Sequence, residues 1–389
     1  MSGIYIHIPF CKQSCSYCDF HFSTSLKYKT EMIGAIIKEI ASRKNQINSV
    51  INTIYFGGGT PSLMNNDDLL ILVEAVYKNY DVAEKIEFTI ECNPDDLSKE
   101  KLIQLKSAGI NRLSIGVQSF IDEELRFFNR AHTAAEAETS IKLSQDAGFD
   151  NITIDLIYGS PLLTNKSWLQ NLNKVAKYNI PHLSAYSLTV EKKTALGHQI
   201  STGKIPALID DNTNNQFRVL IEETKKMGFT QYEVSNFGKE GYYSQHNSNY
   251  WKGEEYLGFG PSAHSYLKNS PLKRGVRSVF FNDKRCWNVA NNIKYIKALT
   301  DGSSYFEEEI IDEITAYNEY ILTRLRTMWG VDFAYIKTNF NEELNRHFEQ
   351  ELKRYLNSSY LHQLNNKVIL TDQGILITDK ITSDLFYVK

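Results

Sequence analysis

Long apolar runs are missing from this chain of 389 residues, in which no segment reaches the roughly 18 residues that a membrane-spanning helix needs. An excess of one charge is missing as well, because 43 Lys and Arg residues face 46 Asp and Glu residues. A protein that coats nucleic acid or anionic lipid is therefore not expected. The first residues show no basic region followed by a small-residue cleavage site, so no secretory leader is expected. Together these absences predict a globular, cytoplasmic protein.

Cysteine is scarce and unevenly placed. The chain has five cysteines, and an odd number in an intracellular protein argues against a disulfide framework. Three of them, Cys11, Cys15 and Cys18, lie within eight residues directly after an apolar run. Clustered thiolates bind soft metals, and a structural zinc site normally has four protein ligands. Three thiolates without a nearby fourth cysteine therefore favour a [4Fe-4S] cluster with one iron left open.

Short runs of β-branched and aromatic residues alternate with helical patterns through the first half of the chain. This alternation predicts six strands in series, at residues 4–8, 53–56, 86–90, 112–117, 152–157 and 183–188. Six β-then-α units predict a parallel sheet, and six is fewer than the eight units of a closed barrel. We therefore expect an α/β fold, a partial and open (β/α)6 barrel, over residues 1–230.

The composition changes after residue 230. Residues 231–305 are rich in Tyr, Asn, Gly and Ser with weak periodicity, and we expect them to form a connecting segment. Residues 306–389 show helical patterns followed by a hairpin pattern, which predicts a small winged-helix-like domain that begins with a solvated helix start at residues 307–309. This domain has no basic stripe, so we expect a structural or partner-docking role and no nucleic acid as a partner.

Polar residues gather where the predicted strands end, which is where ligands bind in (β/α) barrels. The run Gly57–Pro61 ends the second strand; glycine lets a ligand approach the backbone, although the same run also fits a plain tight turn. Glu91, Gln118 and Asp155 lie at strand ends or just beyond, where a buried carboxylate or amide needs a partner. Carboxylates there can hold ribose hydroxyls or a cation, and Arg130 can hold a carboxylate in a bidentate fork.

The CxxxCxxC spacing after the first strand of such a barrel resembles the radical S-adenosylmethionine (SAM) superfamily, and Tyr17 before the last cysteine also fits. In that superfamily the open iron binds SAM, and reduction cleaves SAM to a 5′-deoxyadenosyl radical. Longer stretches resemble the group of the oxygen-independent coproporphyrinogen III dehydrogenases, namely residues 5–11, 57–61, 91–94, 116–120, 129–130 and 155–161. This resemblance runs along nearly the whole chain. It implies SAM contacts from Tyr5, Gly58, Gly59, Thr60, Glu91, Gln118, Arg130 and Asp155. A side chain at position 59 is expected to fill the space that SAM needs and to leave the cluster in place.

Three features separate the dehydrogenases of this group from its heme chaperones. The dehydrogenases have a fourth cysteine two residues after the third, where this chain has Phe20. They also have a long extension before the cysteines, whereas ten residues precede Cys11 here. The chaperones have an HNxxYW motif, which this chain matches at residues 246–251. All three features favour the heme chaperones.

The HNxxYW motif also suggests heme chemistry from its residues. Neutral imidazole is a common iron ligand and aromatic rings pack on porphyrins, although a single His in a polar segment is usually a surface residue. With the resemblance, we expect His246 to contact iron, Tyr250 and Trp251 to pack on the ring, and Asn247 to hold the loop. We expect this segment near the open side of the barrel.

The sequence thus predicts a heme chaperone that binds a [4Fe-4S] cluster, SAM and heme and hands heme to hemoprotein acceptors. Two alternatives stay open: a coproporphyrinogen III dehydrogenase, and a radical SAM enzyme with an unrelated substrate. The sequence therefore also leaves open whether the protein is an enzyme. It does not decide whether the chain forms a homodimer, whether it contacts a membrane protein transiently, or which residues are the heme ligands.

Overall fold

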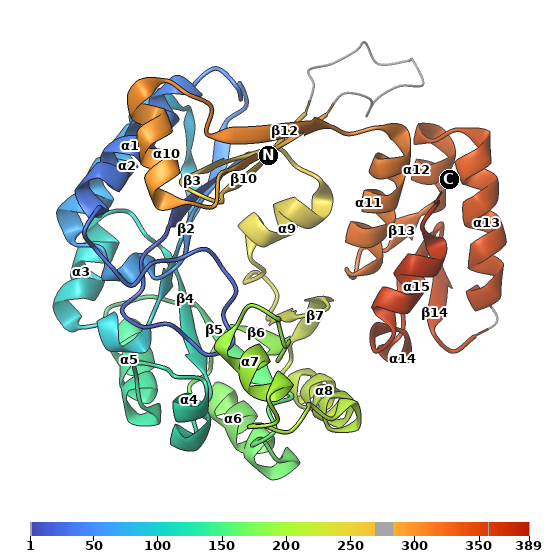
Figure 1. The fold of residues 1–389 in the computed structure, drawn as a ribbon. Helices are drawn as coiled ribbons and strands as arrows, with labels where there is room; N and C mark the ends of the chain where they lie inside the picture. The colour runs from blue at the N-terminus through green and yellow to red at the C-terminus, as the bar shows by residue number, and fades with distance from the viewer. Residues whose placement is uncertain (1, 269–282, 357, 389) are drawn as a thin grey trace.

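The computed structural model describes residues 2–268, 283–356 and 358–388. Within them, a 12-stranded sheet has the order β12-β11-β10-β9-β1-β2-β3-β4-β5-β6-β8-β7 (Figure 1). Its central strands are β1 (Ser2–Ile8), β2 (Ile51–Gly58), β3 (Val82–Cys92), β4 (Arg112–Gln118), β5 (Asn151–Tyr158) and β6 (His182–Ser187). Each pairs in parallel with the next, and this arrangement confirms the predicted open (β/α)6 barrel.

Helices connect the parallel strands and cover the outer face of the sheet (Figure 1). They are α1 (Lys29–Ser42), α2 (Asn66–Asn79), α3 (Lys99–Ser107), α4 (Asp122–Phe127), α5 (Ala134–Asp146) and α6 (Asn165–Lys177). Two further helices, α7 (Ala195–Ser201) and α8 (Asp210–Lys226), follow β6. Side-chain caps fix several starts: Thr133 and Glu136 form a reciprocal capping box at α5. Apolar residues of helices and strands form one buried core, which is why the strand ends are free to present polar groups.

Residues 231–305 contribute regular elements that the weak periodicity did not predict. These elements are β7 (Thr230–Glu233), β8 (Asn236–Gly238), α9 (Gln245–Lys252), β9 (Tyr256–Phe259), β10 (His264–Leu267), β11 (Lys284–Asn288) and α10 (Asn292–Asp301). Strand β9 pairs in parallel with β1, and β10 and β11 continue the sheet beyond it. Each strand has five residues or fewer, too short to show an alternating pattern. We call β9–β12 the sheet extension.

The expected helix start at residues 307–309 is wrong. These residues belong to β12 (Phe306–Ile310), which pairs antiparallel with β11. The acidic run is stable in a strand because opposite charges face it: Lys284 pairs with Glu308 at 3.1 Å and Arg285 pairs with Glu309 at 3.1 Å.

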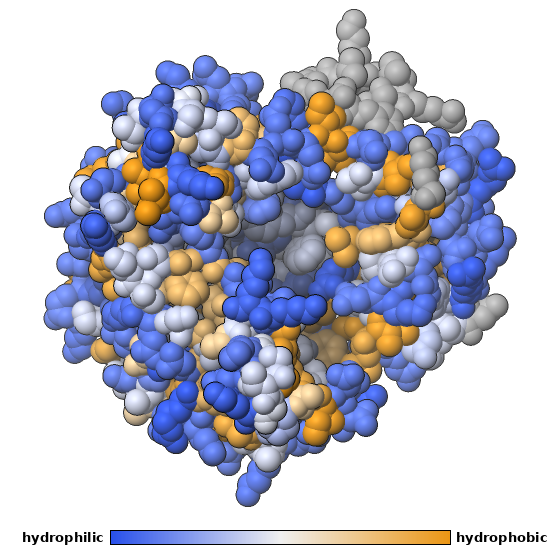
Figure 2. Space-filling view, viewed as in Figure 1, coloured by the Kyte–Doolittle hydropathy of each residue, from blue (hydrophilic) through white to orange (hydrophobic). Residues whose placement is uncertain are grey.

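The C-terminal elements have a hydrophobic core of their own. They comprise α11 (Glu313–Leu325), β13 (Val331–Asp332), α12 (Phe333–Asn339), α13 (Glu342–Leu356), β14 (Leu361–Leu364), β15 (Lys367–Leu370), α14 (Asp372–Ile375) and α15 (Thr378–Leu385). The helices and the small antiparallel sheet β13-β15-β14 fit the winged-helix-like pattern. Figure 2 shows the face of the molecule hollowed between the barrel and these elements. In the described segments, no helix has the length and apolar character to cross a membrane.

Candidate functional site

A cavity of about 550 Å³ lies where the six parallel strands end. We call it the cysteine cavity. Among the residues predicted from the sequence, it is lined by Cys11, Cys15, Tyr17, Cys18, Gly58, Gly59, Thr60, Glu91, Gln118, Arg130 and Asp155. Consecutive parallel strands bring their carboxyl ends to one rim, so residues far apart in sequence meet there.

The loop after β1 presents the three cysteines, all of them half-buried. Backbone hydrogen bonds fix this loop on both sides: Cys11 N–H donates to Ser23 O at 3.0 Å, and Ser16 N–H donates to Phe128 O at 3.0 Å. Burial raises the pKa of Cys11 and raises that of Cys18 to about 11, so these two thiols stay protonated and metal binding would release their protons. Over the described residues, no three His, Cys, Asp or Glu side chains are already arranged to hold a single metal ion.

The other two cysteines differ in position. Cys92 ends β3 and lines the cysteine cavity, but its thiol is buried and points to Ile90 O at 3.7 Å. Cys286 lies in β11 and is buried in the sheet extension. Three thiols on one loop therefore remain the donor set that fits an iron–sulfur cluster with an open iron.

Arg130 connects the cysteine loop to the strand ends. Its guanidinium donates to Asn93 Oδ1 at 2.6 Å, to Gly116 O at 2.7 Å and to Cys15 Sγ at 3.3 Å. Its Nε atom is buried and has no hydrogen-bond partner among the described residues. A buried N–H without a partner beside a cavity suits an anionic ligand group, such as the carboxylate of an amino acid.

Two carboxylates form the floor of the cysteine cavity. Glu91 accepts hydrogen bonds from Tyr55 OH at 2.9 Å and from Gly58 N–H at 3.0 Å. Burial raises the pKa of Glu91 to about 7 and that of Asp155 to about 6. Both groups therefore gain from a ligand that brings hydroxyls or a positive charge. Beside them, Gln118 ends β4 with φ at +64°, a conformation that few non-glycine residues adopt and that is typical of functional sites.

The raised pKa of Glu91 predicts a pH dependence of stability. In the unfolded chain its carboxyl loses its proton near pH 4.3, whereas the folded chain retains the proton up to about pH 7. The folded state thus binds more protons in this window, so the contribution of Glu91 to stability decreases as the pH rises through it. We expect Glu91→Gln, in cluster-free protein, to raise the free energy of unfolding relative to wild type more at pH 7.5 than at pH 4.5, as measured by urea titration. Equal differences at both pH values would contradict this.

Gly58 and Gly59 are needed for the packing of the first two strands. A Cβ at Gly58, where φ is +109°, would lie 2.6 Å from the His7 ring. A Cβ at Gly59 would lie 2.6 Å from Phe10 O and 2.8 Å from Phe10 N. Phe10 directly precedes Cys11, so a side chain at position 59 would displace the cysteine loop. This corrects the expectation that a side chain at position 59 would block SAM and leave the cluster in place.

We predict that Gly59→Ala lowers the iron and sulfide content of the purified protein as well as its affinity for SAM. The cause is the clash with the Phe10 backbone, which cannot move without moving Cys11. Gly34→Ala in α1 is the matched control, because a Cβ there would have no atom within 4 Å. A Gly59→Ala protein with full cluster content would contradict the prediction.

Tyr5 does not line the cysteine cavity but lies one layer below it, inside the barrel. Its hydroxyl is 3.2 Å from His7 Nδ1, and its ring stacks on Tyr55 with the centroids 6.0 Å apart. Because Tyr55 donates to Glu91, Tyr5 supports the floor of the cavity through Tyr55.

The structure places the HNxxYW motif on α9, whose side chains reach the barrel interior. His246 is 1% exposed. Its Nδ1 lies 2.8 Å from Thr53 Oγ1 and its Nε2 lies 2.6 Å from Tyr250 OH, so both ring nitrogens have partners. Burial lowers the pKa of His246 to about 3, which keeps the ring neutral. The expected position near the open side of the barrel therefore does not hold for His246, since its ring packs on Tyr55 inside the barrel.

The other three residues of the motif are half-buried. Asn247 donates its backbone N–H to Ser244 Oγ at 3.2 Å, which caps the start of α9. Tyr250 lines a second cavity of about 320 Å³, which lies between α9, the sheet extension and the helices α11 and α12. We call it the Tyr250 cavity. The sequence did not predict it, because its walls come from three separate parts of the chain.

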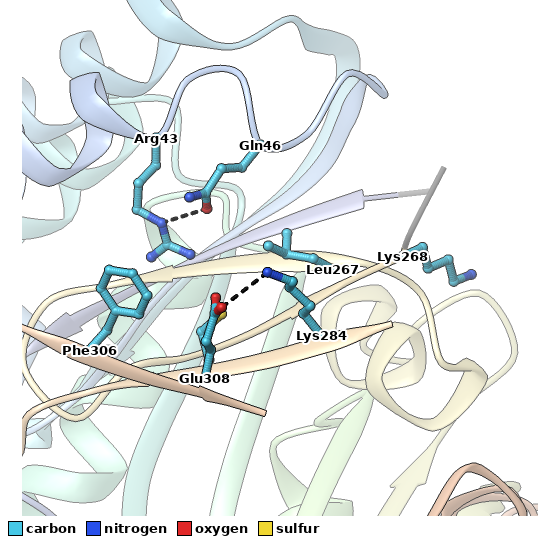
Figure 3. A pocket seen from close by; sticks show the side chains of 8 residues that line it. Arg43, Gln46, Leu267, Lys268, Lys284, Phe306 and Glu308 are labelled. Carbon is cyan, nitrogen blue, oxygen red and sulfur yellow. Dashed lines mark hydrogen bonds and ion pairs between the residues drawn. The ribbon is translucent and has the colours of Figure 1, made fainter. Parts of the chain in front are cut away.

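A third cavity lies between the end of α1 and strands β10–β12 (Figure 3). Most of its polar groups are paired with one another: Arg43 Nε donates to Gln46 Oε1 at 2.8 Å, and Lys284 pairs with Glu308. Lys268, which also lines it, pairs with Glu254 outside the cavity. This pairing leaves little for a ligand to bind.

Among the residues that line the cysteine cavity but were not predicted as site residues, three stand at notable places. Asn93 follows Glu91 at the end of β3 and accepts from Arg130. Tyr186, 44% exposed, comes from the end of β6, and Phe20, 70% exposed, follows the last cysteine. The sequence signal that could have identified them is their position at or beyond the end of a predicted strand.

Comparisons with known families match two parts of the chain. The radical SAM superfamily matches residues 5–175, and the HemN C-terminal domain matches residues 311–377. The first match covers β1 to β5 of the six strands that end at the cysteine cavity, and the second covers most of the C-terminal elements.

Three similar proteins give a consistent result. The chain is 32% identical over 385 residues to the heme chaperone HemW of Bacillus subtilis, covering 98% of both chains. It is 30% identical over 381 residues to the heme chaperone HemW of Lactococcus lactis, covering 98% of this chain and 96% of that protein. The chain is 35% identical over 270 residues to the heme chaperone HemW of Escherichia coli, and this match covers 67% of this chain and 69% of that protein.

Among solved structures, coproporphyrinogen III oxidase (HemN) from Escherichia coli, described as a radical SAM enzyme, superposes with a TM-score of 0.83. The superposition covers 99% of this chain and 89% of that one at 20% sequence identity. It confirms the partial barrel together with the C-terminal domain as the fold.

Proposed function

Because the chain belongs to the HemW family of heme chaperones within the radical SAM superfamily, we propose that it binds a [4Fe-4S] cluster, SAM and heme and passes heme to hemoprotein acceptors. As part of the same proposal, the protein works in the cytoplasm and residues 306–389 dock the acceptor.

The observation that carries the proposal is the meeting of three cysteines with a ring of polar groups in one cavity. Cys11, Cys15 and Cys18 would hold the cluster, which supplies an open coordination position and an electron for SAM when it is bound. The buried Arg130 Nε, which has no partner among the described residues, would bind the methionine carboxylate. Glu91 and Asp155 would accept hydrogen bonds from the amine or the ribose hydroxyls.

A coproporphyrinogen III dehydrogenase is the second candidate, favoured by the fold shared with HemN. Against it, the side chain at the position of the dehydrogenases' fourth cysteine is Phe20, which is 70% exposed at the cavity. A radical SAM enzyme with an unrelated substrate is the third candidate and leaves the HNxxYW motif without a role in heme binding.

Two measurements separate the three candidates. Hemin titration of the cluster-loaded protein with SAM, followed by absorbance, should show saturable binding for the chaperone, and its absence would contradict that proposal. Anaerobic incubation with SAM, a reductant and coproporphyrinogen III should leave the substrate unchanged. Formation of protoporphyrinogen would support the dehydrogenase instead.

A further inference from the structure

The turn that follows helix α4 has an asparagine where glycine is the usual residue. Asn129 has φ at +54°, a left-handed conformation that glycine adopts without strain. Its backbone N–H donates to Arg126 O at 3.1 Å, and the N–H of Arg130 donates to Leu125 O at 2.8 Å. This pair of bonds is the Schellman motif, which ends helices at a left-handed residue. The turn alone therefore gives no reason for an asparagine side chain at this position.

Other helix ends of the same kind show what the turn itself requires. The same pair of backbone bonds ends α3 at Gly109, α5 at Gly148 and α8 at Gly228. Helix α6 has an asparagine at the equivalent position, Asn179 with φ at +49°. The side chain of Asn179 has a partner of its own, since its Oδ1 accepts from Lys239 Nζ at 2.5 Å. Asparagine at such a turn thus goes together with a use for its side chain.

The side chain of Asn129 is used at the cysteine loop. Its Nδ2 donates to Ser14 O at 2.7 Å, and its Oδ1 accepts from Gln13 Nε2 at 2.9 Å. Gln13 Nε2 also donates to the backbone O of Asn129 at 3.0 Å. Gln13 and Ser14 lie between Cys11 and Cys15 and are both exposed, so burial in the core does not hold them. One side chain thus fixes the segment that separates the first two cysteines.

The residues on either side of this pair are also held by partners from outside the loop. Lys12 Nζ pairs with Asp95 at 2.8 Å and also with Asp96, both in the turn η2 (Pro94–Asp96) after β3. Arg130 donates to Cys15 Sγ at 3.3 Å. Each residue from 12 to 15 therefore has a hydrogen-bond partner in η2 or in the turn after α4. The loop has this shape without any contribution from a bound metal.

We propose that Asn129 is a positioning residue for the iron–sulfur cluster: it clamps Gln13 and Ser14 so that Cys11 and Cys15 keep the spacing that cluster binding needs. The proposal rests on the proposed function, because it takes the three cysteines as the cluster ligands. Groups behind the ligands of a metal site fix the orientation of those ligands and thereby increase metal affinity. The Asn129 side chain should therefore matter for retention of the cluster and not for the stability of the fold.

The test is the rate at which the reconstituted full-length protein loses its cluster to an iron chelator, followed by the decay of visible absorbance. Asn129→Gly keeps the left-handed turn and removes both side-chain hydrogen bonds, so it should lose its cluster about fivefold faster than wild type or more.

Asn179→Gly is the matched control. It makes the same substitution at the same kind of turn, but at the opposite end of the barrel, where α6 leads into β6. This variant should lose its cluster at the wild-type rate. In cluster-free protein, both glycine variants should unfold at the urea midpoint of wild type, because glycine suits the turn. A lower midpoint for Asn129→Gly alone would assign the side chain to the fold and overturn the proposal.

Asn129→Asp tests the clamp without removing the side chain. Aspartate tolerates the left-handed conformation and can still accept from Gln13, but it has no N–H for Ser14 O and would place a carboxylate oxygen against this carbonyl. It should therefore also lose its cluster faster than wild type. Loss at the wild-type rate in either Asn129 variant would overturn the clamp and leave the cluster ligands as proposed. A wild-type protein that takes up no cluster would instead refute the proposed function.

Discussion

Cys11→Ala, Cys15→Ala and Cys18→Ala should each abolish the visible absorbance and most of the iron of the reconstituted protein. The three thiols lie on one loop in one cavity, and the described residues around them offer no further thiol in place of a lost ligand except the buried Cys92. The loss should be nearly complete for each variant, because a cluster with two protein ligands is not held at an open-iron site.

Cys92→Ala and Cys286→Ala are the controls for this series. Cys286 lies in the sheet extension, and the Cys92 thiol points to Ile90 O. Both variants should keep their iron and sulfide. Cluster loss in either one, with the circular dichroism spectrum of wild type, would contradict the assignment of the three ligands.

Glu39→Ala should cause a large loss of stability. Glu39 is fully buried and accepts from Arg43 at 2.9 Å, Asn288 at 2.8 Å, Gly260 N–H at 2.9 Å and Tyr295 OH at 2.5 Å. It thereby fastens α1 to the sheet extension and to α10. Removing it leaves the buried Arg43 without its carboxylate, and breaking a buried ion pair costs about 3–5 kcal/mol.

Urea unfolding monitored by circular dichroism measures this effect. Glu74→Ala, an exposed position on α2, is the control and should change the free energy of unfolding by less than about 0.5 kcal/mol. A loss below about 1 kcal/mol for Glu39→Ala would show that the buried network is not what joins the sheet extension to the barrel.

The six parallel strands could be predicted because each is a short run of β-branched and aromatic residues with a helix after it. The strand predicted at residues 53–56, for example, is the centre of β2. The cysteine cavity followed from the same pattern, since residues at strand ends of a parallel sheet share one rim. The position of Cys11, Glu91 and Asp155 at one rim was thus readable from the sequence.

The sheet extension and the place of His246 could not be predicted in the same way. Strand β9 pairs with β1 across most of the chain length, and no local pattern reports such a pairing. His246 lies in a polar segment, and its burial depends on Thr53 and Tyr250, which only the folded chain brings to its two nitrogens. The Tyr250 cavity has the same origin, because its walls form when the C-terminal elements pack near α9.

The most direct test of the central claim is heme transfer. Protein loaded with its cluster, SAM and one equivalent of hemin is mixed with an apo-hemoprotein, and the absorbance of the acceptor's heme is followed over time. The account predicts that the acceptor gains heme faster from the loaded protein than from the same protein lacking its cluster, at equal hemin concentration. Transfer at the same rate from both, or from free hemin added alone, would contradict it.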